Sequence, residues 1–64
     1  MSKGKMADKF IELRKETGLS QKKFAAVFEI PAGSYAHWEQ GLVAPPDYVY
    51  NMMVDKLKQD GLIK

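Results

Sequence analysis

The apolar residues of this chain recur with the spacing of amphipathic helices, most clearly between residues 19 and 41. Ser20 can cap a helix there, because a serine hydroxyl accepts a hydrogen bond from an amide two or three residues further on. Pro31 interrupts that helix, since proline lacks an amide proton and restricts the residue before it. We therefore predict two short helices, over residues 20–28 and 31–40, joined by a tight turn. The apolar positions that share a face are Phe24, Ala25 and Phe28 in the first and Tyr35 and Trp38 in the second.

Two longer helices are predicted on either side of this stretch, over about residues 6–17 and 46–60. Gly18 follows the first of them, where a left-handed cap suits glycine, and Pro46 suits the first turn of the last. Short helices cannot bury their apolar faces alone, so the segments should share one core. The predicted fold is all-α, a compact bundle of four to five short helices in a single domain over residues 1–64. The expected core positions of the outer helices are Met6, Phe10, Leu13 and, at the margin, Ile11, followed by Val49, Tyr50, Met53, Val54 and Leu57.

Length and composition narrow the possibilities. The 64 residues are near the lower limit for a core that folds without covalent staples, and there is no cysteine to supply a disulfide or a thiolate metal site. A hydrophobic fraction of 45% argues against disorder. No apolar run approaches the length of a membrane span, and no signal peptide precedes the helices. We therefore expect a cytoplasmic protein with no membrane partner, whose first five residues form a polar arm.

Charge is distributed unevenly along the chain. Residues 1–23 hold seven Lys or Arg against three Asp or Glu, a balance of +4, whereas residues 24–64 hold three against five, a balance of −2. A basic first third on a small domain suits a polyanionic partner. Lysines that only keep a surface soluble would give the same numbers, so charge alone does not decide between these readings.

The stretch LRKETGLSQKKFAAVFEIPAGSYAHWEQGLVAPP, residues 13–46, resembles the helix-turn-helix domain of the phage-repressor family, the Xre-like type of Cro and lambda repressor. With the apolar residues of the next helix, the resemblance covers roughly residues 10–57. The order and spacing of so many positions make it a specific signal. The residues that carry it are Leu13, Arg14, Gly18, Leu19, Ser20, Gln21, Ala25, Ile30, Ser34, Trp38, Glu39, Gly41 and Pro45.

The resemblance implies a lambda-repressor-like fold and a sequence-specific DNA-binding regulator of transcription, most often a repressor and of bacterial or phage origin. Its second short helix, residues 31–40, would lie in the major groove while the first braces the DNA backbone. In the family the residue at the position of Gln21 contacts a backbone phosphate and supports the second short helix, and Lys22 and Lys23 could add charge-assisted phosphate contacts beside it. The residues expected to contact DNA are Gln21, Lys22, Lys23, Ala32, Gly33, Ser34, His37 and Gln40, with Ala36 also on the outer side.

The sequence departs from the family pattern at several outward positions. Glu29 stands at a turn position usually held by glycine, where a positive φ is often required, and Pro31 replaces the usual serine cap. Ala32 and Gly33 stand where members often carry side chains that hydrogen-bond base edges. Alanine can touch a thymine methyl and glycine allows close approach, but neither reads a donor and acceptor pattern. These departures weaken the expected sequence specificity more than the expected fold.

Several residues can be interpreted either as structural or as functional. The helical spacing of Tyr35 and Trp38 favours core walls over base-stacking platforms, with the larger Tyr35 side chain expected to bring its hydroxyl to the surface. His37 is either a DNA contact or an inert surface residue. For Glu39, a structural anion that fixes the turn is favoured over an acid catalyst, and the resemblance implies that it pairs with Arg14. With no metal-ligand cluster and no nucleophile beside a base, we expect no enzyme and no cofactor.

The last helix is broadly apolar and is followed by a hydrophobic tail, Leu62 and Ile63, that a monomer would have no reason to expose. We therefore expect a homodimer through residues 46–60 and this tail. The apolar loop Leu42-Val43-Ala44 could bind another protein. That loop, with Ala32 and Gly33, keeps a second hypothesis open: a protein-interaction or antitoxin-type module that retains the helix-turn-helix scaffold with weak or no DNA reading.

Overall fold

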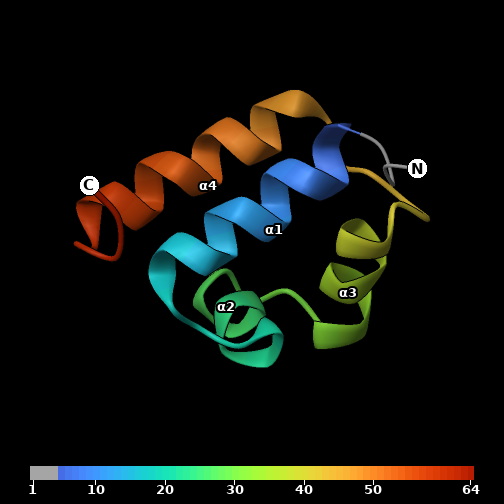
Figure 1. Cartoon of the computed structure of the whole chain (residues 1–64). Coiled ribbons are helices and arrows are strands. Elements are labelled where there is room, and N and C mark those ends of the chain that lie inside the picture. Colours follow the sequence, from blue (N-terminus) through green and yellow to red (C-terminus); the bar gives the residue numbers. More distant parts are fainter. Residues whose placement is uncertain (1–4) are drawn as a thin grey trace.

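A computed structural model describes residues 5–64, which form an all-α fold as the sequence predicts. The first four residues of the predicted polar arm lie outside this range. None of the helices described is both long and apolar enough to span a lipid bilayer. Figure 1 shows the helices in order, and their bounds are α1 Lys5–Thr17, α2 Gln21–Val27, α3 Ala32–Gln40 and α4 Asp47–Gln59.

The helix ends follow from local chemistry. The hydroxyl of Ser20 accepts a hydrogen bond from the backbone N–H of Lys23 at 3.2 Å, which confirms the predicted cap of α2. Pro31 and Pro46 precede α3 and α4 and supply no side-chain cap, so ring geometry alone starts these helices, one residue later than the sequence suggested. Gly41 ends α3 with a φ of 80°, a left-handed conformation that costs glycine little.

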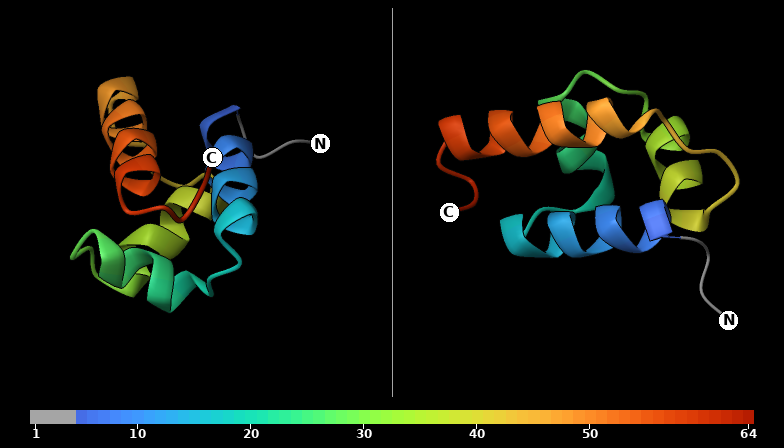
Figure 2. Two further views of the ribbon diagram at one scale, coloured as in Figure 1. Left: turned by 90° about the vertical axis from the view of Figure 1, so that its left-hand side faces the viewer. Right: turned by 90° about the horizontal axis from the view of Figure 1, so that it is seen from above.

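The four helices form two layers. In Figure 1 and in both views of Figure 2, α1 and α4 run in the same direction. Figure 1 and the left view of Figure 2 show α2 and α3 together on one side of them. α3 packs against both α1 and α2, so the two short helices are fixed to each other and to the longer α1. The bundle therefore leaves the outer sides of α2 and α3 uncovered by any other helix.

Aromatic rings fill the centre of the core. The largest fully buried side chains are Phe10, Phe24, Tyr35 and Leu57. The Phe10 ring lies 6.0 Å from the Tyr35 ring in an edge-on arrangement and 5.2 Å from the ring of Trp38. Tyr35 and Trp38 are thus core walls, as their spacing predicts.

One expectation about exposure is wrong. The Tyr35 hydroxyl does not reach the surface: it is buried and donates to the Phe10 carbonyl oxygen at 3.3 Å, because α3 lies close enough to α1 for this carbonyl to accept.

Leu62 and Ile63 form the hydrophobic tail that follows α4. Both are half-buried and pack against the core of their own chain, since the chain turns back after α4 (Figure 1). The tail therefore contributes to the hydrophobic core of its own protomer.

Candidate nucleic-acid interface

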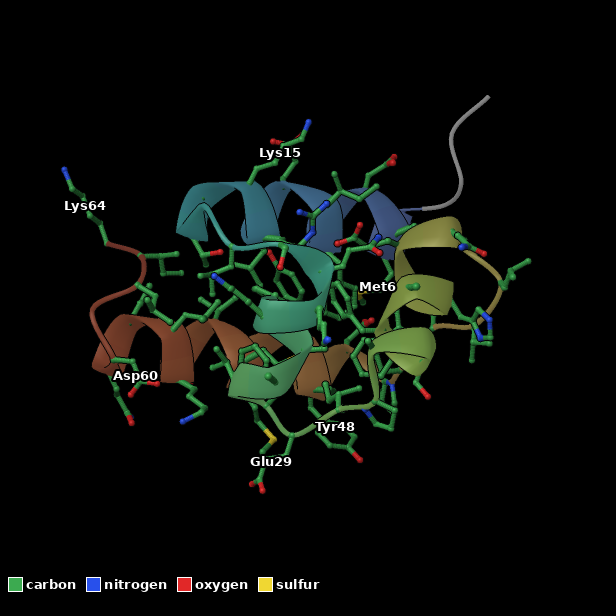
Figure 3. The ribbon with its side chains drawn as sticks, turned by 90° about the horizontal axis from the view of Figure 1, so that it is seen from below. Met6, Lys15, Glu29, Tyr48, Asp60 and Lys64 are labelled. Carbon is green, nitrogen blue, oxygen red and sulfur yellow. The ribbon has the colours of Figure 1, made fainter. Side chains whose placement is uncertain are left out.

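The turn between α2 and α3 sets the relation of the two short helices. Glu29 has a φ of 57°, a positive value such as the family pattern suggests for this position, where glycine is usual. A left-handed residue other than glycine costs about 1–2 kcal/mol, so the surrounding fold must hold this turn in place. The backbone N–H of Ile30 donates to the carbonyl of Ala25 at 3.0 Å and closes the turn. Figure 3 looks onto α2 and α3, with Glu29 at the edge of the molecule that also carries Tyr48.

The residues expected to contact DNA all have exposed side chains or, for glycine, an exposed backbone. They fall into two groups along the two helices. One group occupies the first turn of α2, and the other begins in the first turn of α3. From Gly33, this second group continues to His37 and Gln40, four and seven residues further on, which lie on the same face of the helix. The groups are Gln21, Lys22 and Lys23 on α2, and Ala32, Gly33, Ser34, His37 and Gln40 on α3.

The outer side of α3 offers few side-chain hydrogen-bonding groups near its start. A Cβ built onto Gly33 would meet nothing within 4 Å, so packing within the protein does not require glycine there. Glycine inside a helix is less favourable than alanine by roughly 0.5–1 kcal/mol. The position is therefore costly for the fold without any internal benefit. Lys22 and Lys23, by contrast, take part in no ion pair within residues 5–64.

A polar cluster beneath these helices joins three of them. The Glu39 carboxylate on α3 accepts from Arg14 Nε at 2.6 Å and from Arg14 Nη2 at 3.2 Å, a two-pronged ion pair with α1. It also accepts from the Gln21 amide nitrogen on α2 at 2.9 Å. Arg14 Nη1 donates to the carbonyl of Leu19 at 3.1 Å. We call Arg14, Gln21 and Glu39 the Glu39 cluster.

The cluster bears on two sequence-based expectations. The predicted Arg14–Glu39 pair is present. The resemblance also implied that Gln21 supports the second short helix, and its bond to Glu39 on α3 is in accord with that. Glu39 was not predicted as the partner, because no spacing rule links residues 18 positions apart. Gln21 thus lies between the exposed surface of α2 and the Glu39 cluster: its side chain is exposed, and it donates one hydrogen bond to Glu39.

Burial and hydrogen bonding act in opposite directions on Glu39. Burial raises its pKa, but the hydrogen bonds from Arg14 and Gln21 and the positive charge of Arg14 lower the pKa by more, so the net value lies below the ordinary one. The hydrogen bond to Glu39 raises the pKa of Arg14. Burial, reinforced by the nearby Glu39 charge, raises the pKa of Tyr35 well above its usual value. The cluster is therefore a charged pair with a neutral phenol beside it.

A family model described as helix-turn-helix matches residues 10–49, well over half of the chain. The protein belongs to this helix-turn-helix family. The match spans most of α1, the whole of α2 and α3, and the start of α4, so it contains both groups of predicted contacts and the Glu39 cluster. No curated protein and no solved structure matched the chain.

Membership of the helix-turn-helix family supports a DNA-binding regulator over a catalyst. Within the part of the chain that the structure describes, no three His, Cys, Asp or Glu side chains gather where they could hold a metal ion. In this helix-turn-helix protein the exposed sides of the two short helices carry two lysines and Gln21 on α2 and the small residues Ala32 and Gly33 at the start of α3.

Proposed function

We propose that this protein is a sequence-specific DNA-binding regulator of transcription, most simply a repressor, acting in the cytoplasm of a bacterium or on behalf of a phage. α3 would enter the major groove, and the start of α2 would meet the phosphate backbone. The observation that carries the proposal is the exposed start of α2, with Gln21, Lys22 and Lys23, beside an uncovered α3 inside a helix-turn-helix unit. Phosphate contacts from such groups position a protein on DNA, and contacts to base edges specify the sequence.

Within this proposal, the polar and the small outward residues of α3 would have different roles. Ser34, His37 and Gln40 have polar side chains that can reach base edges or phosphate oxygens. Ala32 and Gly33 bring no donor or acceptor in their side chains, so they would contribute close approach and methyl contacts. We therefore expect modest discrimination between bases on a larger, sequence-independent affinity.

We further propose that the protein binds DNA as a homodimer through α4. Tyr48 and Met52 are 64% and 63% exposed, and they border an apolar groove of about 370 Å³. Because Leu62 and Ile63 pack within their own protomer, the first half of α4 is a better candidate interface than the tail. A two-fold dimer would place two copies of α3 about 34 Å apart, one turn of DNA. The groove is lined by Phe28, Ile30, Trp38, Tyr48, Val49, Met52, Met53 and Lys56.

Selection of bound sequences from a pool of random DNA duplexes tests the function, the symmetry and the half-site spacing together. We expect enrichment of a short palindrome whose half-sites lie about one helical turn apart. Enrichment of a single half-site would retain DNA reading and reject the dimer. Absence of any retarded duplex at low salt would reject the function.

A second candidate function is supported by the loop after α3. Leu42 and Val43 are 69% and 55% exposed, and Ala44 beside them is exposed as well. Exposed apolar side chains next to one another suit a protein partner, such as the toxin of an antitoxin-type module. Replacing Leu42 and Val43 with serine separates the candidates, since DNA retardation should persist if the loop serves only a protein partner.

A further inference from the structure

Among the predicted DNA contacts, Gln21 is the one whose side chain hydrogen-bonds into the protein interior within residues 5–64. Its amide nitrogen lies 2.9 Å from Glu39 Oε1, so α2 and α3 are linked directly at the point where α2 begins. The opposite orientation of this amide would set its carbonyl oxygen against a carboxylate oxygen, and the two would repel. Glu39 therefore fixes which end of the amide faces inward.

Counting donors shows what this leaves for an external partner. A glutamine amide has two N–H donors, and one of them is used by Glu39. The other N–H and the carbonyl oxygen belong to an exposed side chain. An N–H donor that is already oriented suits an anionic oxygen, because the side chain loses less conformational freedom when the bond forms.

The charge of Glu39 would by itself oppose an anionic partner. Arg14 offsets it with two short hydrogen bonds, at 2.6 and 3.2 Å, and the pair has no net charge. Glu39 is also buried, so its carboxylate is not in direct contact with a partner at the surface. The cluster can thus orient Gln21 without repelling a phosphate.

We propose that Glu39 is a positioning residue for DNA, which holds the Gln21 amide with one N–H toward the protein and the other toward a backbone phosphate. The inference rests on the proposed function and adds to it a buried acidic residue with no DNA contact of its own. Glu39→Gln disturbs this arrangement with little change in shape. The new amide carries its own N–H donors, which would face the donors of Arg14 or of Gln21.

A double-mutant cycle tests the proposal. The affinities of the wild type, Gln21→Ala, Glu39→Gln and the double variant are measured for a pool of random-sequence duplexes at low salt, at a temperature where circular dichroism shows all four folded. Removing the Glu39 charge can itself strengthen DNA binding, but this effect occurs in both backgrounds and cancels in the cycle. We expect Glu39→Gln to weaken binding about tenfold more in the wild type than in the Gln21→Ala background.

Leu57→Ala is the matched structural control, because it loosens the core from α4 without touching the cluster. Its effect on affinity should be the same with and without Gln21. Equal effects of Glu39→Gln in the two backgrounds, or the same coupling for Leu57→Ala, would overturn the proposal. A wild type that retards no duplex would reject the proposed function itself, and the inference with it.

The salt dependence of the DNA affinity gives a second readout, which does not change when a substitution only destabilises the fold. A neutral amide displaces no condensed cation, so Gln21→Ala should lower the affinity and leave the slope of log affinity against log salt unchanged. Lys22→Ala should reduce that slope by about 0.9, the value for one phosphate contact on duplex DNA. A reduced slope for Gln21→Ala would contradict a phosphate contact by the neutral amide.

Discussion

The inner and outer sides of α3 differ in almost every physical respect. The inner side carries Tyr35 and Glu39, both buried, and every polar atom on it has a partner in α1 or α2. The outer side begins with Ala32 and Gly33, which are both exposed, and a Cβ at Gly33 would meet nothing within 4 Å. The difference shows that the position of α3 is strongly specified, whereas its outward surface is constrained very little by the fold.

This contrast has a consequence for recognition. A rigidly placed helix with a small-residue start can approach a partner closely, but it has few side-chain groups with which to distinguish one base from another. Under the proposed function, affinity should come mainly from the lysines and Gln21 at the start of α2. Substitutions on the inner side should then affect stability, with Glu39 also affecting binding through Gln21, and substitutions on the outer side should affect binding.

The largest effect is expected from Phe10→Ala on α1. Its ring contacts those of Tyr35, Trp38 and Tyr50, and truncating a buried phenylalanine costs about 3–5 kcal/mol. A domain of this size has a total stability of only about 3–10 kcal/mol. Urea unfolding followed by circular dichroism should show a variant that is largely unfolded without denaturant. Lys15→Ala, at an exposed site on the same helix (Figure 3), is the control and should leave the midpoint unchanged. Near-normal stability of Phe10→Ala would contradict the assigned core.

The next effect concerns the Arg14–Glu39 pair. Arg14→Ala and Glu39→Ala should each lower the free energy of unfolding by about 3 kcal/mol, because each leaves a charge without its partner. The double variant should lose much less than the two losses added together, since the second substitution removes the stranded charge. Urea titrations of the four proteins give the coupling. Additive losses would mean that the pair does not stabilise the fold.

Acid should weaken the same contact. The pKa of Glu39 in the folded protein lies below the ordinary value of 4.5, because the hydrogen bonds to its carboxylate outweigh the opposite effect of burial. The stabilisation is therefore complete above pH 4.5 and is lost as the pH falls through the folded-state pKa. The stability difference between the wild type and Glu39→Gln should shrink over this range in urea titrations. A difference that stays constant with pH would show that the charge of Glu39 does not stabilise the fold.

The smallest effect, of opposite sign, is expected on the outer side. Gly33→Ala should raise the free energy of unfolding by up to about 1 kcal/mol, because the added methyl meets nothing and the helix gains a better helix former. Thermal unfolding checks the gain, and DNA retardation of the same variant checks the surface. Under the proposed function the affinity should fall although the fold is more stable. A gain in both would remove Gly33 from the interface.

Much of the fold could be predicted from local patterns. The amphipathic spacing predicts an all-α bundle and the position of Ser20 predicts a cap, and both are confirmed, whereas the positive φ of Glu29 was expected from the family pattern. These features depend on residues close together in the chain, where spacing and turn chemistry are informative. The Arg14–Glu39 pair followed from the family pattern.

The remaining features depend on contacts between distant segments. Nothing in the local sequence indicates that the Phe10 carbonyl accepts from the Tyr35 hydroxyl or that Leu62 and Ile63 turn back onto the core. The link from Gln21 to Glu39 likewise exists only once α2 and α3 are packed. The predicted DNA contacts stay predictions, because an exposed side chain acquires its role from the partner.

The salt dependence of DNA binding tests the central claim most directly. If the lysines at the start of α2 contact phosphates of the DNA backbone, the affinity for a random-sequence duplex should fall steeply as the salt concentration rises. Replacing Lys22 and Lys23 together with alanine should reduce the slope of log affinity against log salt by about 1.8 per protomer, the value for two phosphate contacts. A complex whose affinity does not change with salt, or a slope that the double replacement leaves unaltered, would contradict the account.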